Sequence, residues 1–334
     1  MTEPAQCLST RPIDPADALR RFEAEAEFGV CDTGRYRCRY WTWGEGPPLV
    51  FIHGLSDRAR AFALVSSLLS CQFRCIAYEL PAGRGDGARL RRYTHDDLVF
   101  DLFALLDHLA VQQAYLFGAS FGSTIALAAL RSQPARLPRG ILQGGFAWRP
   151  LAKAEVWLAR AARFWPGSMG HVPLRRTLLR YSHYPPFASR PSDFWQIFAG
   201  TCAAAPIAAV AHRATLLHRV DLRAALAEIR QPTLLVCGEY DPLVGTNCEE
   251  ELLRGLPNAG LVKLAGCGHN PLYSHPENLA ELVRAFLMPC GGCDSASTCP
   301  LAHEACHART VETNGLPCED SSLTGVRGRS DDAQ

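Results

Sequence analysis

The sequence predicts an α/β fold with a mostly parallel β-sheet that is covered by helices on both faces. Short apolar runs alternate with helical stretches from about residue 34 to residue 288, which is typical of this fold class. The central runs are continuously apolar, as expected for strands that are covered on both faces. The chain has 334 residues, of which 48% are hydrophobic and 20% charged, so it can bury a substantial core.

The apolar runs give seven candidate strands, and helices are expected between them. Amphipathic helices are expected where apolar residues recur at spacings of three and four, over 94–109, 123–132 and 276–287. A further helix is expected over 15–28, within an N-terminal extension that comprises residues 1–33. The candidate strands are 35–43, 48–53, 74–80, 114–117, 140–143, 233–237 and 260–264.

One long segment interrupts this alternation and divides the predicted core into residues 34–145 and 230–288. Residues 146–229 contain no clear strand, and prolines break their helical patterns. The same segment carries several aromatic residues, including Trp157 and Trp165. We therefore expect a helical cap, inserted after the strand at 140–143, that lies over the functional site.

The charge balance excludes some classes of partner. With 34 basic and 33 acidic residues, the whole chain has no net field that would attract nucleic acid or an anionic membrane surface. No basic segment followed by an apolar stretch opens the sequence, and no run of eighteen apolar residues occurs. A cytoplasmic protein without a membrane span is expected, and its oligomeric state is left open.

The fourteen cysteines fall into two groups. Nine are scattered through the body, mostly in apolar segments, where a free thiol packs as a small hydrophobic group. The other five lie in residues 289–334, which are poor in large apolar side chains, so a disordered tail that carries thiols is expected. Zinc binding is the alternative for this tail, although the second ligand pair is irregular. Its candidate ligands are Cys290, Cys293, Cys299 and Cys306.

The strongest chemical signal is Gly118-Ala119-Ser120-Phe121-Gly122. It lies between a short apolar run, expected to be a strand, and a helical stretch. A serine between two glycines at a strand-to-helix turn has the pattern of a nucleophile elbow, because Gly118 and Gly122 lack the Cβ atoms that would block a tight turn. Ser120 is the predicted nucleophile.

Two further residues follow predicted strands in the order that such a nucleophile needs. Asp241 comes shortly after the strand at 233–237, and His269 comes shortly after the strand at 260–264. A serine hydroxyl needs an imidazole to take its proton and a carboxylate to orient that imidazole. The order serine, aspartate, histidine is that of the α/β-hydrolases, so Asp241 is the predicted acid and His269 the predicted base.

A fourth motif, His53-Gly54-Leu55, follows the strand at 48–53. Gly54 lets the backbone turn so that an amide can point into the site. The N–H groups of Leu55 and Phe121 would then form an oxyanion hole. His53 is assigned to support of this loop, because the base is already His269.

On these motifs the chain resembles the α/β-hydrolase superfamily, in the serine hydrolase branch with an HG-x oxyanion loop and a helical cap. The resemblance covers about residues 34–288 and is carried by the segments HGLS, GASFG, GEYDPLV and GCGHNP. It implies the roles given above for Ser120, Asp241, His269, Leu55 and Phe121, and it calls for no cofactor and no metal in the core.

Departures from relatives in the superfamily narrow the expected activity. Haloalkane dehalogenases and epoxide hydrolases use an aspartate where this chain has Ser120, and the chain lacks an HGGG run. The expected activity is therefore hydrolysis of a carboxylic ester or thioester of an apolar acyl group, through an acyl-enzyme on Ser120. The alternatives are acyl transfer, cleavage of a carbon–carbon or peptide bond, lyase chemistry, or ligand binding without turnover.

Overall fold

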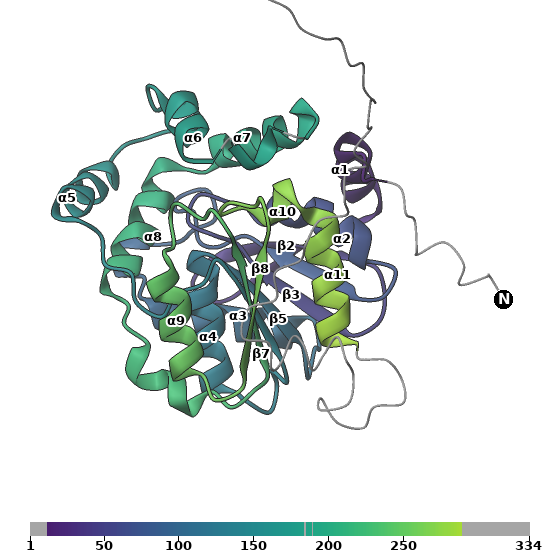
Figure 1. The fold of residues 1–334 in the computed structure, drawn as a ribbon. Coiled ribbons are helices and arrows are strands. Elements are labelled where there is room, and N and C mark those ends of the chain that lie inside the picture. Colours follow the sequence, from purple (N-terminus) through teal and green to yellow (C-terminus); the bar gives the residue numbers. More distant parts are fainter. Residues whose placement is uncertain (1–11, 184, 189, 289–334) are drawn as a thin grey trace, which may run out of the picture.

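The computed structural model describes residues 12–183, 185–188 and 190–288. An eight-stranded sheet in the order β1-β2-β4-β3-β5-β6-β7-β8 lies between two layers of helices (Figure 1). This confirms the predicted α/β fold. The strands are β1 (Glu27–Asp32), β2 (Arg37–Trp43), β3 (Pro48–Ile52), β4 (Arg74–Tyr78), β5 (Tyr115–Ala119), β6 (Gly140–Gln143), β7 (Thr233–Gly238) and β8 (Ala259–Leu264).

The sheet is parallel from β4 to β8, and β1 and β2 pair antiparallel at one edge. Since the parallel strands all run in one direction, the loops that follow β3, β5, β6, β7 and β8 meet at the same edge of the sheet. This edge brings together the segments in which the sequence motifs lie.

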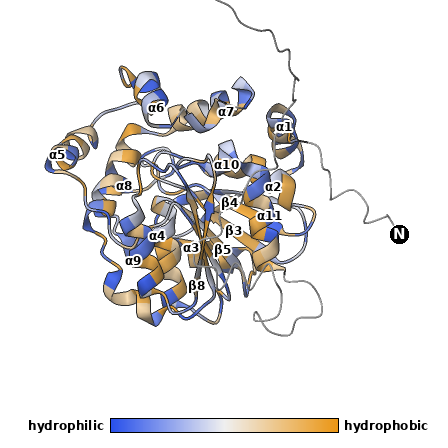
Figure 2. Ribbon diagram, in the orientation of Figure 1, coloured by the Kyte–Doolittle hydropathy of each residue, from blue (hydrophilic) through white to orange (hydrophobic). Residues whose placement is uncertain are grey.

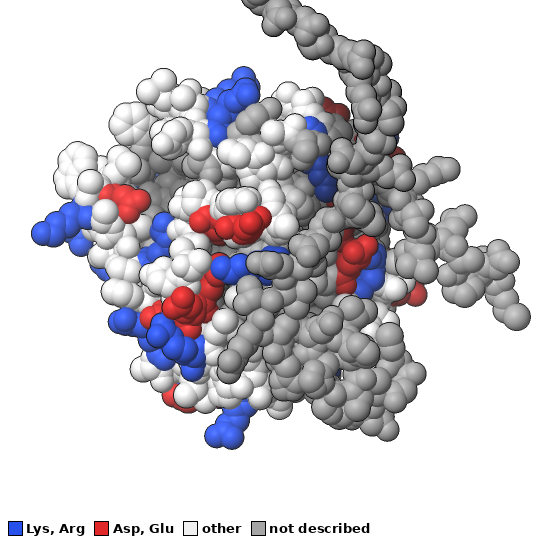
Figure 3. Space-filling model, in the orientation of Figure 1, with Lys and Arg blue, Asp and Glu red and all other residues white. Residues whose placement is uncertain are grey.

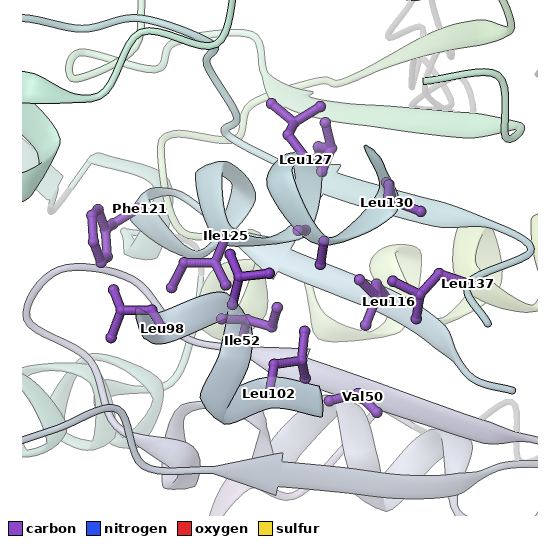
Figure 4. Close-up of a cluster of buried hydrophobic side chains, with 14 of the residues drawn as sticks. Val50, Ile52, Leu98, Leu102, Leu116, Phe121, Ile125, Leu127, Leu130 and Leu137 are labelled. Atoms are coloured by element: carbon purple, nitrogen blue, oxygen red, sulfur yellow. The ribbon is translucent and has the colours of Figure 1, made fainter. Parts of the chain in front are cut away.

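Strand β3 shows why the sheet is buried on both faces. Val50 and Ile52 belong to one hydrophobic cluster, whereas Leu49 and Phe51 belong to the cluster on the other face, because successive side chains of a strand point to opposite faces. Helices α3 and α4 supply apolar side chains to the first cluster (Figure 4), and α2 and α11 supply them to the second. Figure 2 shows hydrophobic segments on these covering helices.

The three core helices for which limits were predicted, α3, α4 and α11, begin and end within two residues of those limits, whereas α2, α9 and α10 were not predicted. Helix α3 begins after Thr94, whose side chain and that of Asp97 form a reciprocal capping box. None of the helices in the described part of the chain is long and apolar enough to cross a membrane. The core helices are α2 (Ala63–Leu69), α3 (His95–His108), α4 (Phe121–Ser132), α9 (Thr246–Gly255), α10 (Pro271–Ser274) and α11 (Pro276–Leu287).

The N-terminal segment differs from the prediction. Helix α1 covers only Pro15–Glu25, and Glu27–Asp32 forms β1, so the expectation of a helix to residue 28 and of an extension to residue 33 was wrong at this point. The strand is hard to see in the sequence because it lies at the sheet edge, where most of its residues are exposed. The sheet therefore begins eight residues before the first expected strand.

The segment between β6 and β7 is helical, as expected. It contains α5 (Lys153–Ala162), α6 (Arg175–His183), α7 (Ser192–Ala204) and α8 (Ile207–Arg219), which lie across one end of the sheet (Figure 1). The short 3-10 helix η5 (Arg223–Glu228) differs, because it packs against α4 and α9. Leu226 and Ile229 are buried in the core cluster, so the last residues of the predicted 146–229 cap belong to the core.

The predicted tail at 289–334, with Cys290, Cys293, Cys299 and Cys306 as its alternative zinc ligands, lies outside the described residues. Seven cysteines of the body are buried free thiols: Cys31, Cys38, Cys75, Cys202, Cys237, Cys248 and Cys267.

Candidate active site

Ser120 occupies a sharp turn between β5 and α4. Its φ of 50° and ψ of −117° place it in a region that non-glycine residues rarely adopt. The Ser120 N–H donates a hydrogen bond of 2.8 Å to the Gln143 carbonyl at the end of β6, which helps to hold the unusual backbone. Such strain persists only where the surroundings fix it, and it is frequent at functional sites.

The two glycines beside Ser120 are required by close packing. A Cβ atom at Gly122 would lie 2.1 Å from the Ile52 carbonyl oxygen, and one at Gly118 would lie 2.7 Å from the Gly122 carbonyl oxygen. Both distances are far shorter than a van der Waals contact. The elbow therefore packs directly against the end of β3. The loop that contains the His53-Gly54-Leu55 motif, which we call the HG loop, begins there.

His269 and Asp241 are hydrogen-bonded to each other and buried. The distance from His269 Nδ1 to Asp241 Oδ2 is 2.7 Å, and their side chains are 6% and 3% exposed. The other Asp241 oxygen accepts hydrogen bonds from the amides of Leu243 and Val244, at 2.8 and 2.9 Å. Burial acts to raise the pKa of Asp241, but these hydrogen bonds outweigh it and the pKa lies below its ordinary value.

Gln143 and Gly144, directly after β6, connect the elbow with the histidine. Besides its carbonyl bond to Ser120, Gln143 donates from Nε2 to the His269 carbonyl at 2.7 Å. Gly144 has a φ of 53°, and a Cβ atom there would lie 2.9 Å from Cε1 of the His269 ring. The imidazole ring therefore packs against the backbone of Gly144. This residue directly follows Gln143, whose carbonyl binds the Ser120 amide.

The HG loop adjoins the elbow, as the motif predicts. A Cβ atom at Gly54 would lie 3.4 Å from Ser120 Cβ. His53 is fully buried, with Nδ1 2.8 Å from the Gly54 carbonyl and Nε2 accepting from the Leu80 amide at 3.1 Å. Burial lowers the pKa of His53 well below its ordinary value, so the ring is neutral and holds the loop in place.

Arg213 on α8 also holds this loop. Its side chain is 3% exposed and donates to the carbonyls of Leu55 at 3.0 Å, Leu80 at 3.1 Å and Pro81 at 3.3 Å. Burial lowers the pKa of Arg213 to about 10, so the guanidinium keeps its charge at neutral pH. One buried cation therefore binds the HG loop to the loop after β4.

A buried carboxylate, Asp57, ties the HG loop to the histidine loop. Its Oδ1 accepts a hydrogen bond of 2.9 Å from the Tyr273 hydroxyl, four residues after His269. Burial raises the pKa of Asp57 above its ordinary value. The segments that hold Ser120, His269 and Leu55 are thus joined by polar contacts that are screened from water.

The cap reaches this site through two segments. Pro186 lies beside Gly268, where a Cβ atom would be 2.9 Å from Pro186 Cγ. Phe198 of α7 has its ring centroid 5.1 Å from that of Tyr273 and 5.7 Å from that of Phe187. Just before α7, Arg190 donates to the Ser274 carbonyl at 2.9 Å and forms an ion pair with Glu277 at 2.8 Å.

Several of these residues were missed in the sequence. Gln143, Gly144, Arg213 and Asp57 were not predicted as site residues. Their residue types are common, and their partners lie up to 216 positions away, so no local pattern marks them. Among the described residues, no group of three or more histidine, cysteine or acidic side chains could hold a metal ion.

Comparison with known proteins gives the family to which the chain belongs. The model of the alpha/beta hydrolase family matches residues 49–282. The pimeloyl-[acyl-carrier protein] methyl ester esterase of Aromatoleum aromaticum is 29% identical over 250 residues, covering 71% of this chain and 96% of that protein. The uncharacterized hydrolase YugF of Bacillus subtilis is 27% identical, covering 72% of this chain and 89% of that protein.

Solved structures show the same fold. A thermophilic esterase from Thermogutta terrifontis superposes with a TM-score of 0.69 at 22% identity, covering 78% of this chain and 98% of that chain. The enol-lactonase from Burkholderia xenovorans also gives 0.69 at 22% identity, covering 78% and 99%. The family match spans well over half of the chain, and the chain therefore belongs to the α/β hydrolase family of enzymes.

Proposed function

We propose that this protein is a serine hydrolase that cleaves a carboxylic ester or a thioester through an acyl-enzyme on Ser120. The observation that carries the proposal is the connection of the strained elbow to a buried histidine–aspartate pair. Gln143 contacts both Ser120 and His269, and His269 is 2.7 Å from Asp241. In this arrangement the serine is the nucleophile, the histidine is the base, and the aspartate orients the histidine.

In the first half of the reaction, Ser120 Oγ attacks the substrate carbonyl while His269 Nε2 takes the hydroxyl proton. Asp241 accepts from His269 Nδ1 and stabilises the imidazolium that forms. The C–O or C–S bond then breaks, and the leaving alcohol or thiol receives the proton from His269. The acyl group remains bound to Ser120.

The negative charge that develops on the carbonyl oxygen needs donors that are already in place. Phe121 is the first residue of α4, and amides in the first turn of a helix have no acceptor within the helix. With the Leu55 amide, it would form the oxyanion hole. In the second half, His269 activates water, which attacks the acyl carbon and releases the acid from Ser120.

The cap supports an apolar acyl group as the substrate class. Phe187, Trp195 and Phe198 form an aromatic cluster that continues to Tyr273 in the histidine loop. The names of the relatives, an esterase of a methyl ester among them, agree with ester cleavage. A small-molecule substrate and action in the cytoplasm complete the proposal.

The test is an activity panel of esters, thioesters and amides with wild type and Ser120→Ala. We expect turnover of short p-nitrophenyl esters that Ser120→Ala lowers by about 10⁶-fold in kcat, the scale known for loss of a serine nucleophile. The variant should unfold at the same temperature as wild type. Turnover retained in Ser120→Ala would contradict the proposal.

Labelling by a fluorophosphonate separates catalysis from ligand binding without turnover. One equivalent should attach to Ser120 in wild type and none in Ser120→Ala. Ser132→Ala is a matched control, because Ser132 lies at the exposed end of the same helix and should leave both labelling and activity intact.

A further inference from the structure

Helices α5 and α6 and the loop between them expose large apolar side chains on their outer surface. We call this surface the cap rim. The segment 157–181 holds seven of the fourteen large hydrophobic side chains that are exposed in the described part of the chain. Each of the seven is at least 62% exposed. They are Trp157 (72%), Leu158 (63%), Phe164 (70%), Trp165 (65%), Leu174 (77%), Leu178 (62%) and Tyr181 (91%).

In α5 these side chains lie on one side of the helix. Trp157 and Leu158 are exposed with Ala154 and Ala161, and spacings of three and four residues place all four on one face. The opposite side carries Val156 and the buried Ala159 and packs on α8. Helix α5 therefore has two apolar faces, of which one is covered by the protein itself.

Helix α6 repeats this arrangement. Leu178 and Tyr181 are exposed at a spacing of three residues, which places them on one side of the helix, and Leu174, directly before the helix, is exposed as well. The less exposed residues Arg175 and Leu179 lie on another side of the helix. Both helices lie at the outer edge of the cap, away from the sheet (Figure 1).

The cap rim is also basic. Residues 153–183 contain six lysine or arginine residues and one acidic residue, a net charge of +5, whereas the whole chain carries +1. Lys153, Arg160 and Arg176 are exposed. Arg91, on the exposed basic turn 89–92, lies 5.6 Å from the Phe164 ring, so this turn extends the basic surface. Figure 3 shows mostly uncharged surface over α5 and α6, with basic side chains at its margin.

We propose that the cap rim docks on an anionic lipid surface. Tryptophan, leucine and tyrosine on one face, with arginine and lysine beside them, is the composition of helices that lie in a membrane interface. Indole and phenol rings favour the boundary between lipid headgroups and acyl chains, and cations near an anionic leaflet each add to binding.

Charge selects this occupant over a second copy of the chain. Two cap rims facing one another would bring together two segments that each carry a net charge of +5, and like charges repel at close distance. A lipid surface that carries negative charge complements the rim without such a cost. Docking would place the cap, and the site beneath it, next to apolar acyl compounds. It can be tested without any enzymatic reaction, so its failure would leave the proposed hydrolase activity untouched.

The experiment is co-sedimentation of the full-length protein with vesicles of phosphatidylcholine alone or with phosphatidylglycerol. We expect binding to the anionic vesicles, much weaker binding to phosphatidylcholine, and release at high salt. Arg160→Gln and Arg176→Gln should each weaken binding about fivefold, the effect of one cation near an anionic leaflet. Trp157→Ala combined with Trp165→Ala should weaken it by about tenfold or more.

Three controls keep the result specific to the cap rim. Phe100→Ala removes an aromatic side chain of 59% exposure on α3 and should bind as wild type. Ser120→Ala should bind as wild type, and the double tryptophan variant should keep full turnover of a water-soluble ester. Absence of binding to anionic vesicles, or binding that the tryptophan and arginine variants do not change, would overturn the proposal. So would a dimer that these variants dissociate.

Discussion

The loops around His269 and the cap rim differ in burial: the first are packed inside the protein, and the second is exposed to solvent. Every residue of β7, which leads to Asp241, is buried, and Asp241 and His269 are almost fully screened from water. In α5, by contrast, Ala159 is the one buried residue, and Trp157 of α5 and Tyr181 of α6 are exposed to solvent. The site is fixed by contacts within the protein, whereas the outer face of the rim lies in solvent.

Because buried contacts fix the site, a change of one atom there should have a large effect. Asp241→Asn keeps the shape of the side chain but cannot hold the His269 tautomer that serves as a base. We expect kcat for the best ester of the panel to fall by about 10⁴-fold. Asp193→Asn, on an exposed position of the cap, is the control. A loss below tenfold would show that the pair at 2.7 Å does not act in the reaction.

The packing of the elbow gives the next largest effect. Gly122→Ala would place a methyl carbon 2.1 Å from the Ile52 carbonyl oxygen, and β3 or α4 would have to move. We expect the free energy of unfolding in urea to fall by about 3 kcal/mol or more, as for severe overpacking of a core. An unchanged denaturation midpoint would mean that the elbow can relax away from β3.

A smaller effect follows from the pKa of Asp241, which is lower in the folded chain than its ordinary value. Such a carboxylate stabilises the fold fully above its unfolded pKa of about 3.9, and the contribution is lost as the pH falls toward the folded pKa. Below pH 4 the stability of wild type should therefore fall more steeply than that of Asp241→Asn. The difference in slope should not exceed about 1.4 kcal/mol per pH unit, the value for one proton. Parallel curves from urea titrations between pH 2.5 and 6 would contradict this.

The smallest effect, of opposite sign, is expected in the cap. Gly200 lies on the exposed side of α7, and a Cβ atom there would meet no atom within 4 Å. Since glycine is a poor residue for a helix interior, Gly200→Ala should raise the free energy of unfolding by about 0.5 to 1 kcal/mol. Replacement of glycine by alanine would thus stabilise the protein at position 200 in the cap and destabilise it at position 122 in the elbow. Destabilisation by Gly200→Ala would indicate a contact at this surface.

The parts of the site that could be predicted are those that a local pattern requires. The elbow at Ser120 needs two glycines within five residues, and Asp241 and His269 follow apolar strands, so the nearby sequence marks all three. The strands were predicted on the same basis, because continuous apolar runs reflect burial on both faces. Strand β1 was missed because most of its residues are exposed.

The remaining parts depend on long-range contacts. Gln143 acts through its carbonyl and its side-chain amide on segments 23 and 126 positions away, and nothing near it in the sequence indicates either partner. Charge is a second example. The whole-chain value of +1 argued against an anionic membrane surface, yet it conceals +5 on residues 153–183. The net charge of the whole chain does not reveal this basic segment, which is found only when the charges of the cap are counted separately from those of the core.

Arg190 and Arg213 have a consequence for how the site can open. Swinging α8 away from the sheet would leave the Arg213 guanidinium without its three carbonyl partners, and lifting the start of α7 would break the Arg190–Glu277 pair. The cost is large for Arg213, which is shielded from water, and the half-buried Arg190–Glu277 pair adds to it. Arg149, shortly after β6, is a third anchor, because it donates to the Leu243 carbonyl at 2.8 Å. Arg149, Arg190 and Arg213 therefore hold the cap to the core at three places, and the exposed Trp157 and Trp165 lie on the long stretch of chain between the first two.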